Sequence, residues 1–179
     1  MTLAALALSV GLTLSGVAGC SRQPSVNAKA TEEAQKAVKS GKIEIKDFNV
    51  SDDRGTTHIR VISPKNLDGK LVPAVFLAPA GTRLFHGNAI SNGDNAEAVP
   101  YALAGMIAVI YELDGDLDSD QPTDKQVKAA MHAFRVSDAG FRNAEQAIDY
   151  AVTSIRGVDK NRIFVAGHSS AANVAIHVA

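Results

Sequence analysis

A serine within a run of small residues is the feature of this sequence that could most directly do chemistry. The run is Gly167-His168-Ser169-Ser170-Ala171, between a short apolar stretch, Ile163 to Ala166, and an alanine-rich stretch. The apolar stretch has the length and β-branched content of a buried strand, whereas the residues after the serines have a helical pattern. We therefore expect a strand, a tight turn and a helix in direct succession, with a serine hydroxyl at the turn.

The residues around this turn favour Ser169 over Ser170 as a nucleophile. A serine in such a turn has a strained backbone that lifts its hydroxyl above the sheet edge. The residues two before and two after it must be small, as Gly167 and Ala171 are. The Ser170 N–H would lie at the helix N-terminus and could stabilise an oxyanion. A serine that only caps a helix after a strand has the same local pattern, so the rest of the chain must decide.

A second backbone donor is expected in the loop after an earlier strand. Leu71 to Leu77 is almost continuously apolar, which predicts an interior strand, and Ala78 to Arg83 follow it. Gly81 and its small neighbours would let the backbone approach a substrate closely, so we expect Gly81 to contribute an oxyanion-hole N–H. An ordinary strand-to-helix loop remains the alternative.

The order of the expected elements predicts an α/β fold. A hairpin over 42–50 and 58–62 precedes strands over 71–77, 106–111 and 163–166, and helices are expected over 96–104, 123–134, 138–155 and after the serine turn. Alternating strands and helices predict parallel strands with helices on both faces. Active sites of such sheets lie at the carboxyl ends of the strands, where the Gly81 loop and Ser169 are both expected.

Composition narrows the classes of function. The chain has 179 residues, 18 basic and 19 acidic, and 46% hydrophobic content, which fits one globular domain. A net charge of −1 and the absence of tryptophan argue against nucleic acid as a partner. Aspartates occupy alternate positions at 114, 116, 118 and 120, as in a calcium-binding loop. The glycine and the final glutamate of such a loop are missing, so we interpret this segment as a solvated acidic loop. No metal and no cofactor are expected.

The N-terminus predicts export. Residues 1–19 carry no charge and are largely apolar from Leu3 to Val17, as in a signal peptide, and Val17-Ala18-Gly19-Cys20 resembles the lipobox of bacterial lipoproteins. We expect a signal peptide over 1–19, lipidation of Cys20, a tether over 20–41 and a domain over 42–179. This predicts an exported protein anchored to a membrane of the bacterial cell envelope. Because no basic residue precedes the apolar run, an uncleaved apolar anchor stays open.

From the hairpin to the last helix, the chain resembles the α/β-hydrolase superfamily. The stretch Val158 to Ala171 is similar to prolyl oligopeptidase-type serine peptidases and dienelactone-hydrolase-like esterases, in which Asp-x-x-Arg-Ile leads into Gly-x-Ser-x-Gly-Gly. Here Ala171 and Ala172 replace the last two glycines. The resemblance implies the N-terminal half of an α/β-hydrolase fold and a serine hydrolase whose Ser169 forms an acyl-enzyme with a small-molecule ester or a peptide.

The histidines depart from this family pattern. The superfamily places its acid and its histidine base after the nucleophile, but the later His177 falls within the helix that starts at the turn. His168 adjoins the nucleophile, and His58, His86 and His132 precede it. We therefore expect this chain to be the N-terminal part of a longer enzyme and inactive alone. The alternative is a non-catalytic, membrane-anchored lipoprotein that uses a hydrolase-like fold for binding.

Overall fold

A computed structural model describes residues 24–117, 119 and 121–179, with side chains from Thr31 onward. The predicted signal peptide and Cys20 lie outside these residues, so their roles stay predictions. The predicted order of elements is confirmed, and the bounds are α1 Pro24–Lys39, β1 Ile43–Asp52, β2 Gly55–Pro64, β3 Val72–Leu77, α2 Asn95–Leu103, β4 Ile107–Tyr111, α3 Asp124–Val136, α4 Phe141–Ser154, β5 Val158–Ala166 and α5 Ala171–Val178.

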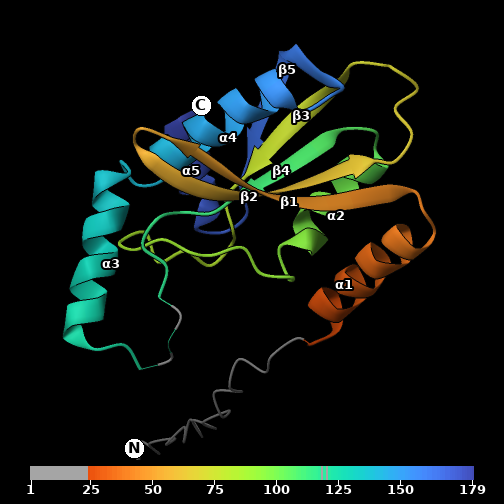
Figure 1. Ribbon diagram of the computed structural model, residues 1–179. Helices are drawn as coiled ribbons and strands as arrows, with labels where there is room; N and C mark the ends of the chain where they lie inside the picture. The colour runs from red at the N-terminus through yellow and green to blue at the C-terminus, as the bar shows by residue number, and fades with distance from the viewer. Residues whose placement is uncertain (1–23, 118, 120) are drawn as a thin grey trace, which may run out of the picture.

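The strands form one mixed sheet in the order β1-β2-β4-β3-β5 (Figure 1). β1 and β2 form the predicted antiparallel hairpin, and β2 also pairs antiparallel with β4. β3 pairs parallel with β4 on one side and with β5 on the other, which confirms that β3 is interior. β5 is the last strand in the described order, and the Phe164 side chain on it is 51% exposed.

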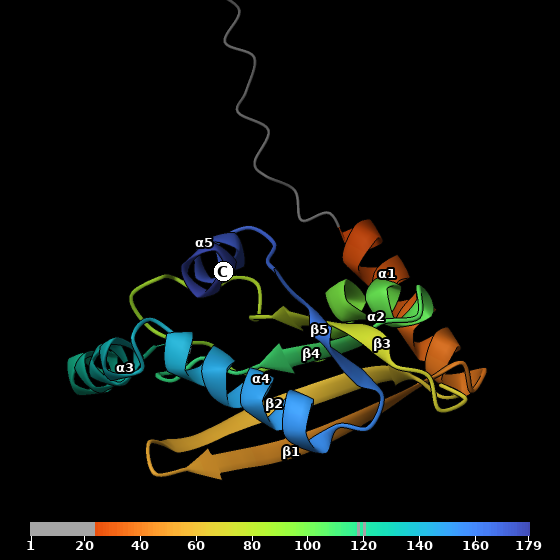
Figure 2. The same ribbon diagram turned by 90° about the horizontal axis from the view of Figure 1, so that it is seen from above.

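Helices cover both faces of the sheet, as predicted. The chain passes from β3 to β4 in one direction along the sheet and from β4 to β5 in the other. Because crossovers between parallel strands are right-handed, this reversal places α2 and α4 on opposite faces. The hydrophobic clusters agree: α1 and α2 pack with residues such as Val75 and Ile110, whereas α4 and α5 pack with residues such as Phe76 and Val109. α3 lies apart from the sheet in Figures 1 and 2.

The helix α1 belongs to the folded unit. Ala34 and Ala37 are buried in the cluster formed with α2 and Ile43, and Figure 2 shows α1 and α2 side by side. The second half of the segment expected as a tether therefore packs on the domain, because its alanines fit against the sheet at the spacing of one helix turn. Among the described residues, no helix combines the length and apolar character needed to cross a membrane.

The connection between α3 and α4 differs from its prediction. The second helix was expected to begin at residue 138, directly after Ser137. Instead, Ser137 ends α3, and its hydroxyl donates to the Phe134 carbonyl at 2.9 Å. Asp138, Ala139 and Gly140 then all have positive φ. Three consecutive left-handed residues turn the chain sharply, so α4 starts at Phe141 and not at Asp138.

Candidate active site

The backbone at Ser169 has the conformation that a nucleophile turn requires. Its φ is +56°, in the left-handed region that a side chain with a Cβ rarely adopts. Such a residue costs about 1–3 kcal/mol and persists only where the surrounding structure holds it. Here Ala171 donates its N–H to the His168 carbonyl and Ala172 donates to the Ser169 carbonyl, both at 3.1 Å. Ser169 is exposed, so its hydroxyl is accessible at the sheet edge.

The two small residues predicted around Ser169 lie where the strand meets the helix. A Cβ added to Gly167 would lie 2.3 Å from the Ala171 carbonyl oxygen, which is backbone and cannot rotate away. Ala171 is completely buried against the core. These contacts explain why a glycine and an alanine occupy these positions, and they support the turn being centred on Ser169.

The Gly81 loop and the Ser169 turn emerge at the same edge of the sheet. Leu77, the last residue of β3, pairs with Ala166, the last residue of β5, and the two strands are parallel. The chain after β3 proceeds to α2 on one face, whereas the chain after β5 proceeds to α5 on the other. Adjacent parallel strands with connections to opposite faces open a crevice between their carboxyl ends, which is the usual ligand site of such sheets.

The loop after β3 is fixed in place by the segment after β4. Asn88 and Leu113 exchange backbone hydrogen bonds, each 3.1 Å long, and the Asn88 side chain donates to the Ala80 carbonyl at 3.1 Å. Gly81 has a φ of +88° and no atom within 4 Å of the position its Cβ would take. A glycine is therefore required there for its backbone conformation, and the open space leaves room for a ligand to approach the chain.

The N-terminus of α5 leaves a donor free. Within the described chain, the Ser170 N–H donates to no protein acceptor, while the next three N–H groups are used in the turn. Beside it, the His168 imidazole lies 3.0 Å from the Glu97 carboxylate in the first turn of α2. Sequence reasoning missed this contact, because only the sheet order brings α2 next to the turn. It holds the His168 ring against α2.

The histidine rings of the described chain have partners other than Ser169. The His58 ring contacts Glu112 and Asp47, and the His86 ring contacts the Gly87 carbonyl and the Phe85 ring. The His132 ring contacts Arg135, and the His177 ring contacts Asp138 and the Phe141 ring. His177 thus faces the start of α4, as expected for a residue one helix length from the turn. Within the described residues, no histidine ring forms a hydrogen bond with Ser169.

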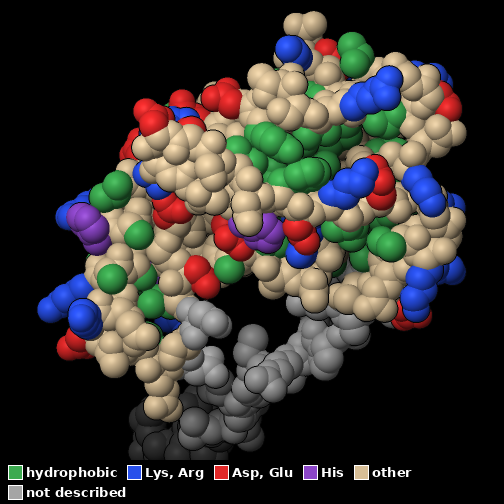
Figure 3. All heavy atoms as spheres, viewed as in Figure 1, with side chains coloured by type: hydrophobic (Ala, Val, Ile, Leu, Met, Phe, Trp, Pro, Cys, Tyr) green, Lys and Arg blue, Asp and Glu red, His purple; other side chains and the backbone are tan. Residues whose placement is uncertain are grey.

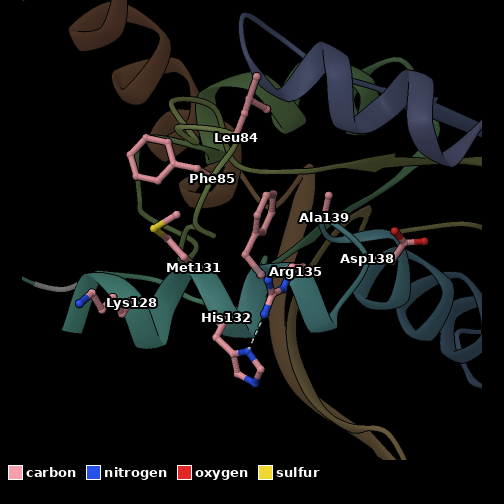
Figure 4. A pocket seen from close by; sticks show the side chains of 9 residues that line it. Leu84, Phe85, Lys128, Met131, His132, Arg135, Asp138 and Ala139 are labelled. Atoms are coloured by element: carbon pink, nitrogen blue, oxygen red, sulfur yellow. Dashed lines mark hydrogen bonds between the residues drawn. The ribbon is translucent and has the colours of Figure 1, made fainter. Parts of the chain in front are cut away.

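Two cavities adjoin the loop after β3. One, of about 430 Å³, is lined by Gly81 together with polar side chains, among them Arg83, His86 and Asn88. The other, of about 510 Å³, lies between this loop and α3 (Figure 4). Figure 4 shows Phe85 of the loop next to Met131 of α3. The side chains of His132 and Arg135, also on α3, form a hydrogen bond with each other. The cavity lined by Gly81 therefore reaches one of the two predicted oxyanion donors, whereas Ser169 and Ser170 line neither of these two cavities.

A buried polar network behind the site was also missed from the sequence. Asn143 of α4 is fully buried and donates to the Thr57 hydroxyl at 2.8 Å and to the Asp114 carboxylate at 3.0 Å. Arg142 donates to the same carboxylate. The sequence contained a sign of this network, because the polar residues 143 and 146 lie next to the alanines of α4 that pack in the core. Asp114 is thereby engaged in fixing the segment after β4, and the described residues contain no cluster of three or more potential metal ligands.

Comparison with known proteins supports the fold assignment. No protein-family profile and no curated protein matches the chain. Among solved structures, the esterase Est22 matches with a TM-score of 0.58 and 17% identity over 85% of this chain and 41% of its own. A Klebsiella pneumoniae protein described as a dienelactone hydrolase matches with a TM-score of 0.52 and 17% identity, over 70% and 49%.

A prolyl endopeptidase also matches, with a TM-score of 0.52 and 14% identity, over 73% of this chain and 18% of its own. The chain therefore spans less than half the length of each of these three proteins. This chain contributes a mixed sheet with helices on both of its faces. The described chain thus has part of the α/β-hydrolase fold, as its resemblance to dienelactone hydrolases, esterases and prolyl peptidases implied.

Proposed function

We propose that this chain is the nucleophile-bearing part of a serine hydrolase that acts on a carboxylic ester or a peptide. The observation that carries the proposal is the positive φ of Ser169 at the carboxyl end of β5, on the same sheet edge as the Gly81 loop. A solvent-exposed serine held in a strained conformation is costly, and a structure that maintains such strain commonly uses it at an active site.

The reaction follows from this arrangement. The Ser169 Oγ attacks the substrate carbonyl carbon, and the negative charge on the carbonyl oxygen is stabilised by the Ser170 N–H and a donor near Gly81. The hydroxyl proton passes to a base and then to the leaving alcohol or amine as the ester or amide bond breaks. Water then hydrolyses the acyl-enzyme. We propose that the base and its acid partner come from outside these 179 residues.

A fluorophosphonate probe tests the nucleophile. The protein produced from its native gene is treated with the probe, and the modified residue is identified by mass spectrometry. We expect modification of Ser169, loss of labelling in Ser169→Ala, and retained labelling in Ser170→Ala, which changes the side chain but leaves the backbone N–H. Equal labelling of wild type and Ser169→Ala would reject the proposal.

The second candidate function is binding without catalysis. It is favoured by the contacts of the histidines, which within the described residues do not involve Ser169. A serine without a base is a weak nucleophile, and loss of a triad member costs several orders of magnitude in rate. A folded native protein that ignores the probe would support this candidate.

We also propose that the protein is exported and anchored to a bacterial membrane through a lipid on Cys20. The support is the sequence of residues 1–20 alone. Mass spectrometry of the protein from its native host tests this. We expect an acylated Cys20 as the first residue and an unmodified, uncleaved chain in Cys20→Ser, whereas an unmodified wild-type cysteine would exclude lipidation.

A further inference from the structure

Basic side chains gather at the end of the sheet opposite to the Ser169 turn. This end is where β3, β4 and β5 begin, and where β1 begins beside the end of β2, since Ile43 pairs with Pro64. Five exposed cations lie here and are called the basic end: Lys39, Lys42, Lys65, Lys70 and Arg156. In Figure 3, blue side chains line the right-hand margin, on the side where Figure 1 places the start of β1 and the end of α1.

The five cations are close together in the fold. The Lys65 N–H donates to the Lys42 carbonyl at 3.0 Å, which joins the end of β2 to the segment after α1. Lys65 and Lys70 of one loop and the distant Arg156 line one cavity of about 610 Å³. Lys46, Glu44 and Asp68 line it too, so basic residues outnumber acidic ones there by four to two. The tertiary structure, and not a basic run in the chain, therefore creates the cluster.

The cations of the basic end form no close ion pairs within the described chain. Among the residues with described side chains, no carboxylate oxygen lies within 4.0 Å of the charged nitrogens of these five cations, whereas Glu44 pairs with Lys46 at 2.9 Å and Asp159 pairs with Arg162 at 2.7 Å. The whole chain has a net charge of −1, so this concentration of positive charge reflects position and not composition. Grouped like charges raise the local potential and attract an anionic partner.

Apolar side chains at the same end identify the kind of partner. Leu71 is 61% exposed directly after Lys70, and Val38 is 39% exposed directly before Lys39. Exposed apolar groups among lysines suit a bilayer interface, where cations meet lipid phosphates and apolar side chains enter the acyl boundary. A nucleic acid offers no such apolar layer, and the low aromatic content of 5% provides few side chains for base stacking.

We propose that the basic end is a docking surface for a membrane rich in anionic phospholipids. This surface is separate from the hydrolase chemistry and goes beyond it. Docking through the basic end leaves the carboxyl ends of β3 and β5, with Ser169 and the Gly81 loop, facing away from the bilayer. A substrate would then reach the turn from the aqueous side.

Vesicle binding by the full chain tests the proposal. The protein is sedimented with vesicles of phosphatidylglycerol and phosphatidylcholine, or of phosphatidylcholine alone, and the ratio of the two affinities is measured. Any contribution of the apolar N-terminal residues is common to both vesicles and cancels in this ratio. We expect clear preference for the anionic vesicles, weakening between about 50 mM and about 300 mM salt as the charges are screened.

Matched charge variants locate the surface. Each cation near an anionic surface contributes about fivefold in affinity, so Lys65→Gln with Lys70→Gln should lower the preference for anionic vesicles about 25-fold. Lys125→Gln with Lys128→Gln removes the same charge from exposed positions on α3 and should change it less than about twofold. Circular dichroism confirms that both double variants are folded.

Three outcomes would overturn the proposal. They are equal affinity for the two vesicle compositions, equal weakening by the two double variants, and displacement of the protein from anionic vesicles by a short DNA duplex at lower phosphate concentration. Leu71→Ser distinguishes the apolar contribution to membrane binding from the electrostatic one. Binding to anionic vesicles should fall several-fold, while binding to a soluble polyanion stays unchanged.

Discussion

The substitution Gly167→Ala tests the close contact of strand and helix on which the Ser169 turn depends. The new Cβ would lie 2.3 Å from the Ala171 carbonyl oxygen, 2.5 Å from the Ala171 carbonyl carbon and 2.7 Å from the Ala172 nitrogen. Ordinary contact needs 3.4 Å, so the start of α5 must recede by about 1.1 Å, the difference between 3.4 and 2.3. Because Ala171 and Val174 are buried in the core, this movement disrupts their packing. Forced overpacking of this kind costs about 1–3 kcal/mol, and a backbone clash belongs at the upper end.

Gly81→Ala is the matched control, since it also adds one methyl group at the same sheet edge. Its φ of +88° imposes about 1–2 kcal/mol of backbone strain, but no atom lies within 4 Å of the new Cβ. The chain has no tryptophan, so urea unfolding is followed by far-ultraviolet circular dichroism. Amide hydrogen exchange of α5 is then compared, and we expect loss of protection only in Gly167→Ala. If Gly167→Ala destabilises no more than Gly81→Ala and leaves α5 protected, the proposed contact is wrong.

Two further predictions concern stability. Asn143→Leu should lower the free energy of unfolding by about 2 kcal/mol, because the Asp114 N–H loses its acceptor at 3.2 Å and the Thr57 hydroxyl loses a donor. As a control, Asn49→Leu at an exposed position should have little effect in the same urea titration. Hydrogen bonds from the Asn161 N–H and the Arg162 side chain hold the pKa of Asp159 below its ordinary value. A lowered pKa means that the carboxylate stabilises the fold above a pH of about 4 and that this stabilisation is lost progressively on further acidification. Asp159→Asn should therefore be less stable than wild type at pH 7, and the difference should shrink as the pH falls below about 4. A constant difference between the two proteins across this pH range would contradict this reasoning.

The elements and the serine turn were predictable from local sequence. Period-two apolar patterns marked the hairpin, and continuous apolar runs marked β3, β4 and β5, because buried strands have no polar face. Gly167 and Ala171 around Ser169 indicated a tight turn, since only small residues fit between a strand and the helix that follows it directly. The φ of +56° at Ser169 agrees with that steric requirement.

The bounds of the helices depended on information that lies outside each segment. Ser137 can cap either helix by its residue type, and its bond to the Phe134 carbonyl was decided by the left-handed turn at Asp138 and Ala139. Ala34 and Ala37 read as part of a polar tether, because two alanines bury little area by themselves. Only the neighbouring α2 and Ile43 supply the surface on which they pack.

Sequence by itself therefore determined where the strands lie along the chain, although β2 and β5 extend beyond their predicted residues, as well as which residue sits at the strained turn and that the turn follows a parallel strand. Tertiary structure alone decided which distant side chains meet. The position of β3 between β4 and β5 brings Gly81 to the edge where Ser169 lies, α2 draws His168 to Glu97, and the ends of α1, β2 and α4 gather the cations of the basic end. The physical reason is that turns and amphipathic patterns are set by contacts within a few residues, whereas strand order and charge clusters depend on packing between segments far apart in the chain.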